Sequence, residues 1–225
     1  MARSYDRVNS ITSFGFSRRW RRQGIDGLDL KPGMLVHDWM TGMGEAWPSI
    51  ARRVGIAGSI VAIDLSPGML AHARRRRASM AAQAIEVVEG DVLETSLADG
   101  SADAVACLFG LKTLSDASAD RLAAEIARVL KPGGRFSVIE VSVPSNRALR
   151  TLYMFYLKRV IPVLGALLLG DPETYRMLGR YTEQFGDARS FADRAKRAGL
   201  QVEFRRWFFG CATGVVGRRP GIEGA

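Results

Sequence analysis

Short apolar runs alternate with stretches of helical periodicity along the middle of the chain, a pattern typical of repeated β-α units. Such units with short connections predict an α/β fold with a doubly wound, mostly parallel sheet covered by helices on both faces. Near the end of the chain, two apolar segments joined at Gly210 predict an antiparallel pair that closes a seven-stranded sheet. Strands are expected at 34–39, 59–64, 84–88, 102–108, 135–141, 201–209 and 212–216, and helices at 45–54, 67–82, around 122–130 and at 189–198.

Two segments fall outside this alternation. Residues 4–22 begin with apolar groups at a helical spacing and continue, after a Phe-Gly-Phe interruption, into a basic turn that carries Trp20, so they predict a helical preface outside the sheet. Residues 146–170 predict a long, largely apolar helical segment that Pro162 and Gly165 break in its later half. The uncharged part of that segment has eleven residues, which is short for a membrane-spanning helix of ~20 residues.

The composition indicates one ordinary globular domain of 225 residues, with 47% hydrophobic and 24% charged positions. The first ten residues lack an apolar signal core, and Cys107 and Cys211 form no CxxC motif, so we expect a reduced, cytoplasmic protein. The net charge of +9 comes mainly from 27 Arg against 5 Lys. No aromatic residues interleave the run at 74–77, which favours a solvated helix face over a nucleic-acid site.

The most informative segment is MLVHDWMTGMGE at 34–45, where an apolar run ends at Asp38 and enters a turn with Gly42 and Gly44. Glycines at this spacing let the backbone approach a ligand closely. The next apolar run closes on Asp64, and Asp91 follows the third. Because the carboxyl ends of parallel strands share one edge of a sheet, the three acids predict a site for a nucleotide-sized ligand.

The turn lacks the G-x-G-x-x-G spacing of dinucleotide folds, which counts against a pyrophosphate. Asp38 and Glu45 bracket it instead, and two acids favour a cationic ligand such as a sulfonium that carries an α-amino group. Asp64 suits the two hydroxyls of a ribose, and Asp91 could accept a hydrogen bond from the exocyclic amine of an adenine. The alternatives are a plain structural turn and aspartates that cap helices.

Further segments carry a resemblance to a known family. The chain resembles class I S-adenosylmethionine-dependent methyltransferases, in particular the ubiquinone and menaquinone C-methyltransferase family. The matching positions are Tyr5, Asp6, Asn9, Ser13, Gly15, Arg18 and Trp20, the segments LFGL at 108–111 and RVLKPGGRFSVIE at 128–140, and Tyr175 within GDPETYR.

The resemblance implies a Rossmann-like methyltransferase fold with S-adenosylmethionine as cofactor. It places the cofactor along Asp38, Thr41, Gly42, Met43 and Gly44, the ribose at Asp64 and Leu65, the adenine at Asp91 and Val92, and Leu108 in the wall of the site. Substrate-binding residues would be Tyr5, Asn9, Phe109, Tyr156 and Tyr175. The single domain 1–225 would divide into an N-terminal helical lid (1–30), a cofactor-binding core (31–145), a helical substrate lid (146–187) and a closing helix with strands (188–225).

The chain departs from the family on its substrate side. Lys112-Thr113 replaces an expected Arg-Asn, and Arg180-Tyr181 replaces an expected Glu-Ser near Tyr175. The acceptor is therefore expected to be a hydrophobic prenyl-quinol-like aromatic or isoprenoid compound rather than one defined quinol.

Methyl transfer is an in-line displacement that depends mainly on positioning and needs no metal. A carbon acceptor on a phenolic ring becomes more nucleophilic when the phenol loses its proton. Lys112 could stabilise the phenolate, and Glu140 or Asp6 could accept the proton. Each has a structural alternative: a surface lysine, a helix cap and a solvated acid. His37 is expected to pack against a helix, and neither of the two histidines supports a hydrolytic triad.

Three other functions stay open: a phospholipid or small-amine N-methyltransferase on the same fold, a nicotinamide-dependent reductase that the missing third glycine disfavours, and an inactive cofactor-binding partner protein. The segment after residue 146 could be a core helix, or a lid whose Leu152 and Phe155 line an apolar wall for a lipid substrate. A peripheral membrane contact and a homodimer are also left open.

Overall fold

The computed structural model describes residues 15–80, 82–169 and 172–221. Its centre is a seven-stranded sheet in the order β3-β2-β1-β4-β5-β7-β6, parallel throughout except for β7, which runs antiparallel to both of its neighbours. The predicted fold class is confirmed, including the antiparallel closing pair. The strands are β1 Leu35–Trp39, β2 Ser59–Asp64, β3 Ala84–Glu89, β4 Ala102–Leu108, β5 Leu130–Val141, β6 Gln201–Trp207 and β7 Ala212–Arg218.

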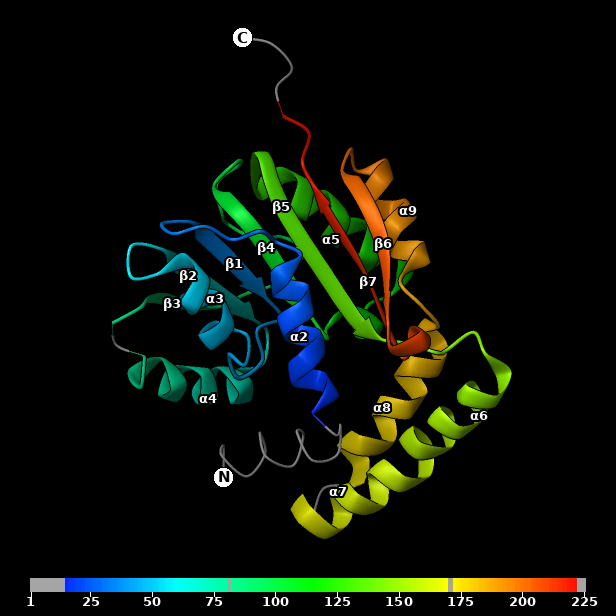
Figure 1. The fold of residues 1–225 in the computed structure, drawn as a ribbon. Coiled ribbons are helices and arrows are strands. Elements are labelled where there is room, and N and C mark those ends of the chain that lie inside the picture. Colours follow the sequence, from blue (N-terminus) through cyan, green and yellow to red (C-terminus); the bar gives the residue numbers. More distant parts are fainter. Residues whose placement is uncertain (1–14, 81, 170–171, 222–225) are drawn as a thin grey trace.

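Helices cover both faces of the sheet (Figure 1). One face carries α2 Phe16–Asp26, α3 Trp47–Val54 and α4 Pro67–Ala78, and the other carries α5 Asp116–Val129 and α9 Arg189–Arg197. Beyond the carboxyl ends of the strands lies a separate helical group, made of α6 Arg147–Phe155, η2 Tyr156–Val160, α7 Ile161–Leu169 and α8 Pro172–Phe185. Two single turns, η1 Leu111–Thr113 and η3 Phe208–Gly210, follow β4 and β6.

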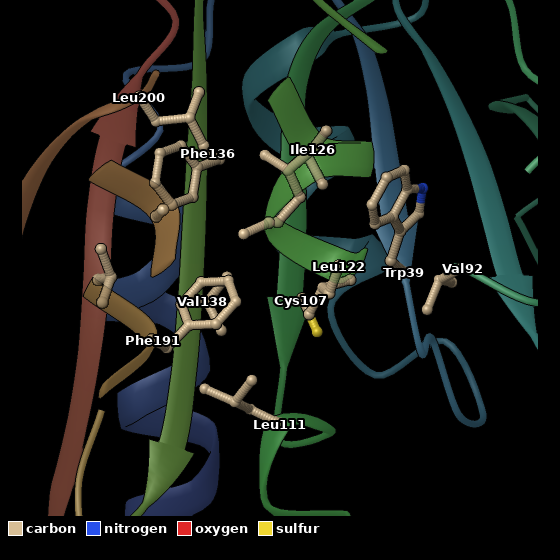
Figure 2. Packing of buried hydrophobic residues seen from close by; sticks show 14 of the residues in the cluster. Trp39, Val92, Cys107, Leu111, Leu122, Ile126, Phe136, Val138, Phe191 and Leu200 are labelled. Atoms are coloured by element: carbon tan, nitrogen blue, oxygen red, sulfur yellow. The ribbon is translucent and has the colours of Figure 1, made fainter. Parts of the chain in front are cut away.

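Alternating strand residues build one apolar core on each side of the sheet, as the period of two in a strand requires. On the α5 and α9 side, Phe136 and Val138 of β5 pack with Phe191 of α9 and Leu122 of α5 (Figure 2). On the other side, Trp47 and Ile50 of α3 belong to a second cluster with Val36 and Ile60 of the strands. Both clusters are more than nine-tenths buried, so the carboxyl ends of β1, β2 and β4 sit on a fixed frame.

The segment expected as a basic turn around Trp20 is helix α2. Trp20, Gly24 and Ile25 are buried against the sheet, whereas Arg18 and Arg19 are exposed. The stretch contains four arginines, and its apolar face is narrow. Gly24 and Ile25 follow Trp20 by four and five residues, which places all three on one side of a helix. The helical preface expected at 4–22 is confirmed for residues 16–22, and the turn around Trp20 is wrong, because the arginines dominate the composition of this stretch while packing decides the structure.

A larger side chain at Gly24 is expected to displace α2. A Cβ placed there would lie 2.7 Å from Cδ1 of Ile139 and 2.9 Å from Cδ2 of Leu108. Both neighbours are buried, so Gly24→Val should lower the free energy of unfolding by about 2 kcal/mol through overpacking. Urea unfolding measures it. Gly68→Val is the control, because the nearest atom at Gly68 is 3.9 Å away, and equal midpoints for the two variants would contradict a close α2–sheet contact.

The expected break of the late apolar helix at Pro162 and Gly165 is wrong. The helix runs on through α7, and the irregularity is the π-helical turn η2, just before the proline. Pro162 has no backbone N–H and would clash with a carbonyl one turn earlier in a regular helix. A wider turn there accommodates the missing hydrogen bond without ending the helix.

Other boundaries shift by a few residues. Helix α4 ends at Ala78 rather than Ala82, and β5 starts at Leu130 rather than Arg135. Strand β6 ends at Trp207, because Phe208 and Phe209 adopt left-handed backbone conformations with φ of 45° and 56°. None of the helices in the described ranges is long and apolar enough to cross a membrane.

Candidate active site

A cavity of about 400 Å³ opens at the carboxyl ends of β1 and β4, the edge where parallel α/β sheets bind their ligands. Its wall combines carboxylates, cations and apolar side chains from five separate parts of the chain. The lining residues are Arg21, Asp38, Met40, Thr41, Gly42, Glu45, Ala46, Met69, Leu108, Phe109, Lys112, Thr113 and Leu178.

Asp38 is the buried acid of this cavity. One of its oxygens, Oδ2, accepts hydrogen bonds from Thr41 Oγ1 at 2.5 Å and from Trp47 Nε1 at 3.0 Å. The pKa of the Asp38 carboxyl is raised to about 7, mainly by burial and also by the nearby charge of Glu45, while the Thr41 and Trp47 hydrogen bonds and the Arg21 charge oppose the rise. Asp38 forms no direct ion pair among the described residues, and a bound cation would favour its charged form.

Gly42 and Gly44 give the turn next to Asp38 a left-handed backbone that residues with a Cβ rarely adopt. Gly42 and Gly44 have φ of 59° and 77°, and a Cβ on Gly44 would lie 2.6 Å from the ring of Trp47. The Met43 N–H donates to Glu45 Oε2 at 3.0 Å, while the Met43 side chain is buried beneath the turn. The predicted residues 38, 41, 42 and 44 thus come together around one loop.

Asp64 joins the ends of two strands. Its Oδ2 accepts the Gly42 N–H at 2.8 Å, and its Oδ1 accepts the Ser66 N–H at 2.9 Å. Leu65, the next residue, is 64% exposed. Because β1 pairs with β2 in parallel register, this carboxylate holds the glycine turn against the end of the second strand.

Asp91 and Val92 lie just past β3, whose last residue pairs with Asp64. The Asp91 Oδ1 accepts the Leu93 N–H at 2.9 Å and shapes its own loop. Val92 is buried in the core on the α5 side (Figure 2). These two residues and Asp64 are close in topology to the glycine turn but do not line the 400 Å³ cavity.

Lys112 and Glu140, both predicted as catalytic, form a single ion pair. Lys112 Nζ lies 2.9 Å from Glu140 Oε1 and also donates to the Phe109 carbonyl at 3.3 Å. Glu140 has no exposed side-chain surface. It also accepts the backbone N–H groups of Lys112 at 3.1 Å and Val141 at 2.7 Å. Lys112 therefore faces the cavity, and Glu140 holds it from behind.

Phe109 reaches the cavity through a left-handed backbone with φ of 73°, which is rare for a residue with a bulky side chain. Its N–H donates to the Ile139 carbonyl at 2.8 Å, and the Arg21 guanidinium lies 5.0 Å from the centre of its ring. The strain therefore aims the ring at the ligand space, next to a cation from α2.

Sequence reasoning missed several residues that line this cavity or contact its wall. Arg21 lies 3.4 Å from Glu45 and links α2 to the glycine turn, while Trp47 donates to Asp38. Leu178 arrives from α8, far along the chain. No local motif marks them, because each acts only through tertiary contacts. The spacing of three residues between Arg21 and Gly24, which puts both on one side of a helix, is the one signal that could have placed Arg21.

Not every predicted site residue is described or reaches the cavity. Tyr5, Asp6 and Asn9 lie outside the described residues, as does the side chain of Tyr175. Tyr156 packs beside Met154, and burial raises the pKa of its hydroxyl. Leu152 and Phe155, expected in an apolar wall, are exposed instead.

His37 is buried in β1 with its ring 6.4 Å from that of Trp39. Burial lowers the pKa of the imidazole to about 4, and Asp103 opposes this only in part. It therefore stays neutral at neutral pH and belongs to the packed core.

The fold and the site define a class. A SAM-dependent methyltransferase from Aquifex aeolicus, known from its crystal structure, has the same fold, with a TM-score of 0.58 at 22% identity over 84% of this chain and 83% of that one. The model of the ubiE/COQ5 methyltransferase family matches residues 1–219. The chain belongs to this family and is a SAM-dependent methyltransferase, as the resemblance implied.

Named relatives agree with this assignment over nearly the whole chain. A demethylmenaquinone methyltransferase of Thermus thermophilus is 34% identical over 98% of this chain and 98% of its own length. One of Bacillus cereus is 29% identical over 96% of this chain and 91% of its own.

Proposed function

We propose that this enzyme methylates a ring carbon of a hydrophobic quinol-like acceptor. The observation that carries the proposal is Lys112, a cation fixed by Glu140 at a cavity wall that also presents Phe109, Leu108 and Leu178. An apolar wall with an oriented lysine suits an aromatic ring that bears an ionised oxygen. The names of the relatives, demethylmenaquinone methyltransferases, point to the same acceptor class.

The residues present fit S-adenosylmethionine as the cofactor. Asp38 and Glu45 offer carboxylates to an ammonium and a sulfonium, and Gly42 borders the cavity where a Cβ would lie 3.3 Å from Glu45 Oε2. The exposed side chains of Leu65 and Met69 offer apolar surface for a base. When bound, the cofactor supplies a methyl group on a positively charged sulfur. The predicted roles of Asp64 at the ribose and of Asp91 and Val92 at the adenine are part of this proposal.

The chain's own contribution is to orient and ionise the acceptor. Lys112 Nζ stabilises the phenolate and so raises the electron density of the ring carbon beside it. Glu140 already accepts three hydrogen bonds and does not line the cavity, so we assign it to positioning Lys112 rather than to proton removal. The phenolic proton passes to Asp6 or to water.

The test is transfer of a labelled methyl group from S-adenosylmethionine to a demethylated naphthoquinol with a short prenyl tail. We expect the label on a ring carbon, located by fragment masses. The control acceptor carries a methyl ether on the phenolic oxygen that would be ionised, and it should give no product. Product from an amine or a phospholipid but none from the quinol would instead support the N-methyltransferase alternative.

A further inference from the structure

The helical group beyond the strand ends exposes a row of large apolar side chains, here called the α6–α7 stripe and made of Leu152, Phe155 and Val163. They are 67%, 59% and 58% exposed. Their neighbours Met154 and Leu157 are buried on the other side of the same segment, in a cluster that Leu178 of α8 also joins. The stripe is therefore not the side by which this segment packs on the protein.

A second apolar feature lies at the same end of the sheet. Phe208 and Phe209, in the turn after β6, are 47% and 77% exposed and have left-handed backbones. The Tyr153 hydroxyl donates to the Cys211 carbonyl at 3.4 Å and so ties α6 to this turn. Both features lie beyond the carboxyl ends of the parallel strands, where the cavity also opens (Figure 1).

The charged residues of the segment that carries the stripe are all positive. The sequence has no Asp or Glu between Glu140 and Asp171, but it has four cations there. Arg147, Arg150 and Arg159 are exposed, and Lys158 pairs with Glu183 of α8 at 2.6 Å. A row of exposed apolar groups flanked by arginines complements a surface that is apolar inside and negatively charged outside.

We infer that the α6–α7 stripe and the Phe208–Phe209 turn dock on the surface of a membrane that contains anionic lipids. A second copy of this chain fits less well, because pairing by this face would bring together arginines of two molecules that each carry a net charge of +9. The inference rests on the proposed function in one respect: docking would turn the mouth of the cavity toward an acceptor that is dissolved in the membrane.

Co-sedimentation of the full chain with lipid vesicles tests the inference. The wild type is expected to bind vesicles of mixed phosphatidylcholine and phosphatidylglycerol, and to bind more weakly at high salt. Leu152→Ser with Phe155→Ser should bind about tenfold less tightly, since the apolar contact is lost. Arg147→Gln with Arg150→Gln should bind about tenfold less tightly to the anionic vesicles and equally well to phosphatidylcholine alone.

Ile56→Ser is the matched control, because Ile56 is 83% exposed but precedes β2 at the opposite end of the sheet. It should bind vesicles as the wild type does. The inference is overturned if the Leu152 and Phe155 variant binds vesicles fully, or if the wild type binds neither kind of vesicle. It is also overturned if the substitutions at Leu152 and Phe155 change only the self-association of the protein. Methyl transfer to a water-soluble acceptor should be the same in the Leu152 and Phe155 variant and in the wild type, so a failure of the proposed function is seen separately.

Discussion

Asp38→Asn is expected to weaken the binding of S-adenosylmethionine by about 100-fold at pH 7.5, since it removes the buried carboxylate that would pair with the cofactor's ammonium. Asparagine keeps the size of the side chain and can still accept hydrogen bonds from Thr41 and Trp47, so the loss reports charge rather than packing. Calorimetric titration measures it. Asp29→Asn is the control, because Asp29 is an exposed residue away from the cavity.

The pH dependence of cofactor binding tests the role of the Asp38 carboxylate in a second way. The pKa of Asp38 is raised to about 7 in the folded protein without cofactor, so the group is protonated below that pH and no longer offers a charge. Affinity should fall about tenfold for each pH unit below 7 in the wild type and stay nearly flat in Asp38→Asn. An equal slope in both proteins would show that another group controls binding.

Folding stability depends on pH in the opposite direction to cofactor affinity. A carboxyl whose pKa is higher in the folded than in the unfolded state binds an extra proton between pH 4 and 7 when folded. The cofactor-free wild type therefore loses stability as the pH rises through this window, and Asp38→Asn does not share that loss. Bound cofactor should restore the stability, because it supplies a cation that favours the charged form.

The sequence predicted the sheet because each strand carries its own signal. The runs that end at Asp64 and Leu108 are apolar almost throughout, as strands buried on both faces must be, and their bounds match those of β2 and β4. The helix around Trp20 and the turn η2 were missed for different reasons. Helix α2 depends on its packing against the sheet, of which Gly24 gives no local sign, whereas Pro162 marks an irregularity without showing that the helix continues past it.

The site divides in the same way. Asp38 and the glycines could be found because strand ends and close backbone turns leave a mark in the local sequence. The pairing of Lys112 with Glu140 could not, since the two residues are 28 positions apart and meet only where β5 passes the turn after β4. Lys112 and Glu140 were predicted to act separately, but they form one ion pair. In our proposal Lys112 contacts the acceptor and Glu140 positions Lys112.

Lys112→Met is therefore expected to destabilise the protein by about 3 kcal/mol, because it leaves the enclosed Glu140 carboxylate without its cation. Glu140→Gln should cost less, since Lys112 borders the cavity and keeps access to water. The double variant should recover most of the stability of the wild type, because it buries no unpaired charge. Urea unfolding of the four proteins gives this comparison as a double-mutant cycle.

Turnover measured in the same four proteins distinguishes a structural role of the ion pair from a role of Lys112 in the reaction. The double variant should be folded but turn over a phenolic acceptor about 100-fold more slowly, since the Lys112 ammonium no longer stabilises the phenolate. Glu140→Gln, which keeps Lys112 but holds it less firmly, should lie between the double variant and the wild type. A stable double variant with full turnover would remove Lys112 from the reaction and favour an amine acceptor, which needs only to be neutral and correctly aimed.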